Sequence, residues 1–227
     1  MRATSRSLVV TAVAAACGLL MTYAVAVLTP MGQYLDSSAM VYVADALADS
    51  QWAEQLLEFV SAASVAALTA GLTVLTAFAR GPRPALAVAL TSVGTVVAAE
   101  VLKAVLARPA LLLETTSNSL PSGHVAAVAG LAVAAVMAVS ADLRTMAASL
   151  GLAAVTATGL ATVALQWHRP SDVLAAALLA VTVGALVATT TRTQPVGDGS
   201  PTIEASNSPR HDNLERPLAD SGAGAAR

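Results

Sequence analysis

Six apolar stretches dominate the chain, and each is near the length that a helix needs to cross a lipid bilayer, about 20 residues. Apolar residues make up 56% of the 227 residues and charged residues 11%, whereas a soluble domain carries about 25% charged residues. The chain is therefore predicted to be an all-α integral membrane protein, a bundle of six transmembrane helices. The helices are expected at about 8–28, 59–78, 85–106, 122–140, 146–166 and 173–191.

The first stretch also has features of a signal peptide. Arg2 and Arg6 precede the apolar run, and Ala-Val-Ala at 24–26 is similar to a cleavage site. Cys17, which follows an Ala-rich run, is similar to a lipoprotein site. The run is about 21 residues long and continues beyond Cys17, which favours a retained transmembrane helix. A single cysteine excludes an internal disulfide.

Residues 1–191 are expected to form one membrane domain, and the composition changes after it. Residues 192–227 are rich in Pro, Gly, Ser, Asn and charged residues, and such segments cannot bury enough apolar surface to fold. This segment is therefore predicted to be a disordered cytoplasmic tail.

The distribution of positive charge predicts the orientation. With both termini in the cytoplasm, nine of the 12 Lys and Arg residues lie in cytoplasmic segments, as the positive-inside rule requires, and the plasma membrane is the expected location. The first extracytoplasmic loop, 29–57, is a candidate amphipathic lid over the site. Its acidic residues are expected either to repel anions or, as we favour, to be solvated. They are Asp36, Asp45, Asp49 and Glu54.

Three cations remain on the extracytoplasmic side, where His124, His168 and Asp172 are also expected. Ionisable residues at membrane depth are costly and usually mark a functional site. The ends of three helices that are distant in the sequence are thus predicted to form one site on the extracytoplasmic face. The three cations are Lys103, Arg108 and Arg169.

The sequence Asn-Ser-Leu-Pro-Ser-Gly-His at 118–124 is typical of a helix start. Asn118 or Ser119 is suited to cap the helix, and proline is favoured in the first turn. Gly123 allows a ligand to approach the backbone, and N–H groups at the start of a helix bind phosphate readily. The alternative is a capped helix with an ordinary interfacial histidine. The candidate N–H groups belong to Ser122, Gly123 and His124.

Lys103 and Arg108 lie on either side of the expected extracytoplasmic end of the third helix. Two cations at this position can bind an anionic group, and the guanidinium of arginine suits paired hydrogen bonds to phosphate oxygens. The alternative is that both side chains are anchors at the membrane interface, with Lys103 paired to Glu100 one turn away.

The sequence Trp-His-Arg-Pro-Ser-Asp at 167–172 places a proline at an expected helix start and His168 four residues before Asp172. At this spacing the carboxylate can accept the imidazole N–H, which selects one tautomer and makes the other nitrogen a better nucleophile. The alternative is that Asp172 stabilises the helix dipole and His168 is an interfacial residue beside Trp167. The second histidine and the cations on the same side favour the functional interpretation.

Together these residues suit phosphoryl transfer through a phosphohistidine. His168 is the candidate nucleophile, Asp172 its orienting carboxylate and His124 the general acid, with cations and helix-end N–H groups around the phosphate. The sequence offers no cluster of carboxylates for Mg²⁺, so neither a metal nor a cofactor is expected. The net charge of −2 gives no reason to expect a nucleic-acid partner.

From about Glu100 to Val173 the chain resembles the type-2 phosphatidic acid phosphatase superfamily of membrane lipid phosphatases. That family has three motifs: Lys, six residues and Arg-Pro; Pro-Ser-Gly-His; and Ser-Arg, five residues, His, three residues and Asp. Residues 121–124 match the second motif in full, and 168–172 match the second half of the third. The resemblance implies a six-helix fold and a membrane lipid phosphate as substrate. It implies His168 as nucleophile, Asp172 as its partner, His124 as acid to the leaving group, and Lys103, Ser122 and Gly123 as phosphate-binding residues.

Two motif positions depart from the family pattern. The Arg-Pro of the first motif corresponds to 110–111, which is Ala-Leu, and an Arg-Pro pair begins two positions earlier at Arg108. The Ser-Arg of the third motif corresponds to Ala161 and Thr162. Arg108 and Arg169 are therefore the candidates to replace the two missing arginines.

Three functions remain open from the residues. The first is hydrolysis of a lipid phosphate at the outer leaflet, with a polyprenyl diphosphate, phosphatidic acid, phosphatidylglycerol phosphate or polyprenyl-linked sugar phosphate as substrate. The second is phosphotransfer, in which an acceptor other than water attacks the phosphohistidine. The third is a non-catalytic lipid-phosphate-binding protein, which the missing arginines favour and the retained His168, Asp172 and His124 oppose. A transporter is disfavoured because no charged pathway crosses the midplane.

Overall fold

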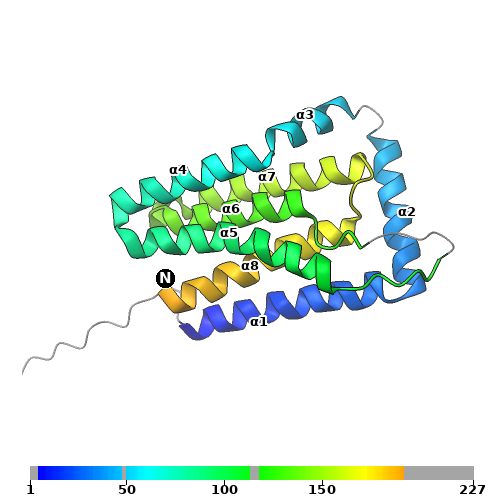
Figure 1. Ribbon diagram of the computed structural model, residues 1–227, viewed down its shortest axis with the longest axis horizontal. Helices are drawn as coiled ribbons and strands as arrows, with labels where there is room; N and C mark the ends of the chain where they lie inside the picture. Colours follow the sequence, from blue (N-terminus) through cyan, green and yellow to red (C-terminus); the bar gives the residue numbers. More distant parts are fainter. Residues whose placement is uncertain (1–4, 48–49, 113–117, 192–227) are drawn as a thin grey trace, which may run out of the picture. The chain divides into compact units, whose positions relative to one another are not determined.

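The computed structural model describes residues 5–47, 50–112 and 118–191, and every regular element within these ranges is a helix (Figure 1). The elements are α1 Ser5–Thr22, the π-helical turn η1 Tyr23–Val27, α2 Pro30–Ala46, α3 Gln51–Phe59, α4 Ala62–Arg80, α5 Pro82–Val105, α6 Gly123–Ala138, the short 3-10 helix η2 Ala141–Leu143, α7 Arg144–Ala164 and α8 Pro170–Thr191.

Five spans are long and apolar enough to cross a membrane. The remaining expected span corresponds to α6, which is apolar but has only 16 residues, fewer than the roughly 20 needed for a full crossing. The all-helical fold is therefore confirmed and fits a multi-pass membrane protein, but five of the six predicted spans meet the length requirement. The five are Ser5–Val27, Ala62–Arg80, Pro82–Val105, Ala141–Ala164 and Pro170–Thr191.

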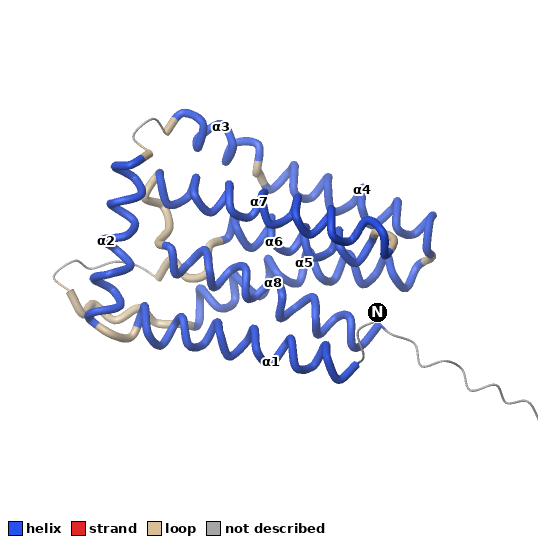
Figure 2. The backbone as a smooth tube through the Cα atoms, turned by 180° about the vertical axis from the view of Figure 1, so that it is seen from behind, coloured by secondary structure: helices blue, strands red, loops and turns tan. Residues whose placement is uncertain are grey.

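Helix α6 contacts α4, α5, α7 and α8, and α1 packs along α8. Figure 2, seen from behind, shows the same pairing of α1 with α8. Small residues allow apolar helices to approach closely. A Cβ atom at Gly130 of α6 would lie 2.9 Å from the Cβ atom of Thr95 and 3.2 Å from the carbonyl oxygen of Ser92, both on α5. Glycine at this position therefore permits the close contact between α5 and α6.

The segment 29–57, which was expected to be a loop, contains α2 and most of α3, which ends at Phe59. The Thr29 hydroxyl caps α2 by accepting the N–H of Gly32 at 3.0 Å, and Pro30 occupies the first turn, where proline is favoured. Polar and apolar residues are mixed along α2 without a long apolar run. A search for membrane-length apolar stretches therefore does not detect this helix.

Helix α2 crosses the end of the bundle at which α5 ends and α8 begins (Figure 1). We call this the α2 end. The first residues of α1 and the last residues of α8 lie at the opposite end. Three segments that are distant in the sequence, 103–111, 118–124 and 165–172, come together toward the α2 end. The predicted tail, 192–227, lies outside the described residues.

Candidate active site

The turn between α7 and α8 carries His168. Helix α7 ends at Ala164, and the N–H groups of Trp167 and His168 then both donate to the carbonyl oxygen of Thr162, at 2.9 and 3.2 Å. Gln166 within this turn has a φ of 57°, a left-handed conformation that residues other than glycine rarely adopt. This tight turn, rather than a continuous helix, places the His168 imidazole beside the first turn of α8.

The His168 imidazole is in contact with the Asp172 carboxylate, with Nδ1 3.4 Å from Oδ2. The same oxygen accepts the Ser119 hydroxyl at 2.7 Å and the backbone N–H of Arg169 at 3.0 Å. The Asp172 side chain is fully buried, and its other oxygen, Oδ1, has no hydrogen-bond partner in the described part of the chain. These contacts orient the carboxylate toward the imidazole.

Ser122 connects the start of α6 to α8. Its backbone N–H donates to the carbonyl oxygen of Asp172 at 3.1 Å, so this N–H group is already paired. Its hydroxyl is buried and has no hydrogen-bond partner among the described residues. The next two N–H groups, of Gly123 and His124, belong to the first turn of α6, where no intrahelical acceptor is available. They are therefore the backbone groups suited to an anion.

Asn118 and Ser119 do not cap α6, and the expectation that one of them would was wrong. The Asn118 amide donates to the carbonyl oxygens of Leu106 at 2.9 Å and Lys103 at 3.3 Å, at the end of α5. The last carbonyl groups of a helix lack intrahelical donors, and the amide supplies one. Ser119 donates to Asp172. Both residues therefore connect this segment to neighbouring elements.

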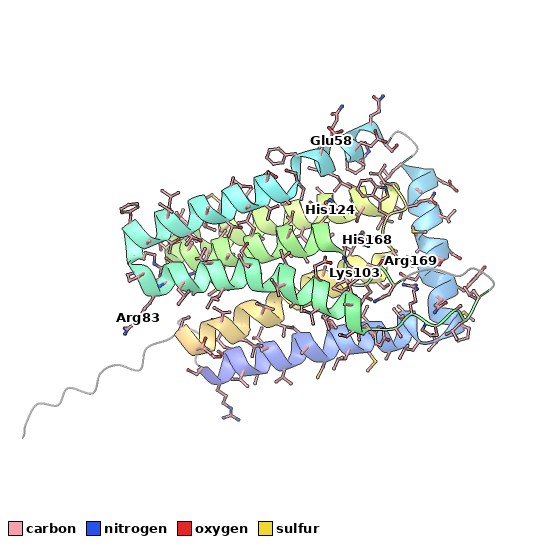
Figure 3. The ribbon with its side chains drawn as sticks, viewed as in Figure 1. Glu58, Arg83, Lys103, His124, His168 and Arg169 are labelled. Atoms are coloured by element: carbon pink, nitrogen blue, oxygen red, sulfur yellow. The ribbon has the colours of Figure 1, made fainter. Side chains whose placement is uncertain are left out.

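A cavity of about 930 Å³ adjoins the two histidines. Its walls on α4 and α5 consist mainly of valine and alanine, with Thr69 and Ser92 hydrogen-bonded to each other at 2.8 Å. The residues that line its polar part are Glu100, Lys103, Gly123, His124 and His168. Figure 3 shows Lys103, His124 and His168 close to one another. The cavity therefore combines one polar part with extended apolar walls.

His124, in the first turn of α6, lines the same cavity as His168. Its ring lies 5.9 Å from the Trp167 ring, centroid to centroid, and the two planes are inclined by 49°. Tilted aromatic pairs at such distances are favourable. Trp167 thus contacts one histidine and directly precedes the other, so that a single turn influences the position of both.

Lys103 pairs with Glu100 one turn away, with Nζ 2.9 Å from Oε1. A Cβ atom at Gly123 would lie 3.3 Å from Glu100 Oε1 and 3.5 Å from Lys103 Nζ. Glycine therefore leaves room for this ion pair beside the start of α6. The pairing with Glu100 that was expected as one alternative is therefore present, and Lys103 also lines the cavity. Binding of an anionic group by Lys103 stays a prediction.

The Arg108 side chain lies between two carboxylates and is only 1% exposed. Its Nη2 is 3.8 Å from Oδ2 of Asp36, and its Nη1 is 3.9 Å from Oδ1 of Asp172. Its three side-chain nitrogens have no hydrogen-bond partner among the described residues, and the residues that line the described cavity do not include it. Burial lowers the pKa of Arg108, because desolvation disfavours the charged form.

Asp36 was expected to be solvated, and that expectation was wrong. Its carboxylate is buried and accepts the backbone N–H of Ser171 at 2.9 Å and the Ser171 hydroxyl at 2.5 Å. Burial also raises the pKa of Asp36 above its ordinary value of 3.8. The only sequence signal for this role is an acidic residue in a segment without a lysine or arginine to pair with it.

Arg169 is half-buried beside the histidine and is held by neutral groups. Its Nε donates to the Ser37 hydroxyl and its Nη1 to the Ser119 hydroxyl, each at 3.3 Å. Thr162, at the position of one missing motif arginine, is fully buried and donates to the carbonyl oxygen of Gly159 at 2.8 Å. Sequence reasoning missed Ser37 and the contacts that Ser119 makes, because serines at these positions carry no distinctive pattern.

The fold and the site together define a class of protein. It is a helical protein whose long apolar helices fit a multi-pass membrane protein, with two histidines, one of them beside a buried aspartate, at the polar part of an apolar cavity. Among the described residues, no group of three or more His, Cys, Asp or Glu is placed to hold a metal ion.

The family model of the PAP2 superfamily matches residues 57–195, more than half of the chain. The protein belongs to this superfamily, whose members are phosphatases that act on phosphate esters, often those of lipids. The matched residues include α4 to α8 and all the motif segments, whereas α1 and α2 precede them. Comparisons with curated proteins and with solved structures gave no match.

Proposed function

We propose that this protein is a metal-independent phosphatase of lipid phosphates or diphosphates, acting at the extracytoplasmic leaflet of the plasma membrane through a phosphohistidine. The cavity carries this proposal: His168, His124 and Lys103 line its polar part, and valine and alanine line its walls. Ligand cavities of about 300–1,000 Å³ bury most of a small ligand's surface. A phosphate ester with a long apolar chain, such as a polyprenyl diphosphate or phosphatidic acid, matches both the polar part of the cavity and its apolar walls.

In the first step, Nε2 of His168 attacks phosphorus, a P–N bond forms and the P–O bond to the lipid breaks. Nδ1 faces Asp172 Oδ2 at 3.4 Å, so the carboxylate favours the tautomer that leaves Nε2 free as the nucleophile. The same carboxylate stabilises the positive charge that develops on the ring. The leaving oxygen takes a proton from His124, acting as general acid.

In the second step, a water molecule attacks phosphorus, His124 accepts its proton, and the P–N bond breaks to release inorganic phosphate. Lys103 and the N–H groups of Gly123 and His124 bind the phosphate oxygens in both steps. Ser122 contributes through its hydroxyl, because its N–H group is paired with the Asp172 carbonyl.

Arg169 supplies the charge that the missing motif arginines would have provided. It directly follows His168, and within the described part of the chain its side chain donates to two neutral hydroxyls rather than to a carboxylate. Its positive charge is therefore not neutralised by a paired anion. Arg108 contributes its charge from a buried position next to Asp172. Its side chain is 1% exposed and lies between two carboxylates.

Phosphate release by the detergent-purified protein tests this proposal. The substrates are phosphatidic acid, phosphatidylglycerol phosphate and farnesyl diphosphate, each with and without EDTA. We expect release from at least one substrate, insensitivity to EDTA, and loss of release in His168→Ala. The matched control is His211→Ala, which changes the third histidine of the chain outside the matched family region.

A phosphoenzyme that survives an alkaline quench but not an acid quench, formed from a radiolabelled substrate, would identify the phosphohistidine. Release undiminished in His168→Ala would contradict the mechanism. Absence of release together with saturable binding of phosphatidic acid would instead identify a non-catalytic lipid-phosphate-binding protein. Transfer of the labelled phosphate to an added alcohol in preference to water would identify a phosphotransferase.

A further inference from the structure

Helix α2 precedes the residues matched by the family model, yet it contacts two of the motif segments. The Gln33 amide donates to the carbonyl oxygens of Val27 at 2.7 Å and Pro109 at 2.8 Å. Asp36, three residues later, accepts both Ser171 donors at the start of α8. Residues three or four apart lie on the same face of a helix. One face of α2 therefore contacts both the segment after α5 and the first turn of α8.

The second observation is the charge arrangement around Arg108. Its guanidinium lies between the Asp36 carboxylate of α2 and the Asp172 carboxylate of α8, with Nη2 and Nη1 3.8 and 3.9 Å from the nearest oxygens. Asp172 Oδ2 is simultaneously 3.4 Å from His168 Nδ1. Because the guanidinium is attracted from both sides, it lies 3.8 and 3.9 Å from the two carboxylates rather than within hydrogen-bonding distance of one of them. Removing Asp36 would leave Asp172 as the remaining anionic partner of Arg108.

We propose that Asp36 is a positioning residue for the His168–Asp172 pair, which rests on the proposed function. It holds Ser171, the residue before Asp172, and it shares the Arg108 charge that would otherwise act on Asp172 alone. Without Asp36, the guanidinium attracts the Asp172 carboxylate, and this carboxylate then holds His168 less well. Asp36 is not among the described residues that line the cavity. The proposal therefore predicts an effect on turnover rather than on substrate affinity.

The test compares Asp36→Asn with Asp45→Asn, which removes an exposed carboxylate from the same helix. The first readout needs no substrate. The protein is labelled with ¹⁵N-histidine, and the ring-nitrogen signals of His168 are assigned by their loss in His168→Gln. At pH 8.5 we expect one tautomer, protonated at Nδ1, in the natural protein and in Asp45→Asn. We expect a mixture of tautomers in Asp36→Asn, and an Asp36→Asn spectrum identical to that of the natural protein would overturn the proposal.

The second readout is the kinetics of phosphate release from a short-chain phosphatidic acid. We expect kcat to fall about 10- to 100-fold in Asp36→Asn, the range that a small displacement of reacting groups produces, with KM changed less than about 2-fold. A rise in KM at constant kcat would contradict the positioning role. If the natural protein shows no phosphatase activity, the proposed function fails, while the tautomer readout still decides whether Asp36 positions His168.

A double-variant cycle separates this role from general destabilisation. Replacing Arg108 as well, in Asp36→Asn/Arg108→Gln, removes the charge that would act on Asp172. The cycle is expected to show coupling, with the double variant losing less kcat than the product of the two single losses. Strictly multiplicative losses would overturn the link through Arg108. Should Asp36→Asn not fold, Asp36→Ser also removes the charge and keeps a polar side chain, and a natural-type tautomer spectrum there would equally overturn positioning by Asp36.

Discussion

Nδ1 of His168 lies 3.4 Å from Oδ2 of Asp172 across the first turn of α8, and Ser119 and the Arg169 backbone donate to the same oxygen. The imidazole is thus oriented by a carboxylate that is itself held from two other positions. Such support is needed because a catalytic group must be close to its productive geometry before the substrate arrives.

The first prediction concerns Asp172→Asn, which retains the shape of the side chain and removes its charge. The amide no longer stabilises a positive His168 ring, and it no longer selects the tautomer with a free Nε2. We expect kcat to fall by about 10²- to 10⁴-fold, as measured by phosphate release from phosphatidic acid. A variant with the natural kcat would remove Asp172 from the mechanism.

The second prediction concerns Arg169→Ala, with Arg83→Ala as the control at the opposite end of the bundle (Figure 3). A charge-assisted hydrogen bond contributes about 1.5–3 kcal/mol, so losing one lowers kcat/KM by about 10- to 150-fold. Arg169→Lys is expected to recover only part of this loss, because lysine lacks the planar guanidinium. Natural rates in Arg169→Ala would show that Arg169 does not replace a missing motif arginine.

The third prediction concerns Glu100→Gln, because Glu100 competes with a substrate phosphate for Lys103. The two groups are 2.9 Å apart, and the glutamate side chain is 60% exposed, so the competition is weak. Exposed ion pairs contribute about 0.2–1 kcal/mol, and we expect KM to fall by about 1.5- to 5-fold with little change in kcat. Glu58→Gln on α3 is the control. An increased KM in Glu100→Gln would indicate that the carboxylate instead holds Lys103 in place.

The fourth prediction is a pH dependence of stability caused by Asp36. Because burial raises the pKa of this carboxyl in the folded protein above its ordinary value of 3.8, the folded state binds the proton more tightly than the unfolded chain. The stability linked to this proton is fully present below pH 3.8 and is lost as the pH rises through the higher folded value. In Asp36→Asn this loss is absent.

Thermal unfolding in detergent from acid to neutral pH measures this effect. The Tm of the natural protein minus the Tm of Asp36→Asn is expected to decrease with increasing pH, because only the natural protein loses stability when this carboxyl ionises. A difference that stays constant, or that grows in favour of the natural protein, would contradict the raised pKa. Asp45→Asn serves as a control for the loss of one carboxylate from α2.

The helical fold could be predicted from local composition. A segment in lipid must satisfy its backbone N–H and C=O groups internally, so long apolar runs become helices. The 16-residue α6 falls short of the predicted 122–140 because it begins after Ser122 and ends at Ala138. Helices α2 and α3 were missed because neither contains a long apolar run.

The sequence by itself determined the all-helical membrane class and the spacing of His168 and Asp172, because hydrophobic length and helical spacing are local properties. Only the tertiary structure decided that Asp36 binds Ser171, that Arg108 lies between two carboxylates, and that Ser119 supports Asp172. Ser119 and Asp172 are 53 positions apart in the sequence, and Asp36 and Ser171 are 135 positions apart. No local pattern specifies such partners, since they form only when packing of α2, α5, α6 and α8 brings their ends together and excludes the water that would otherwise solvate each charge.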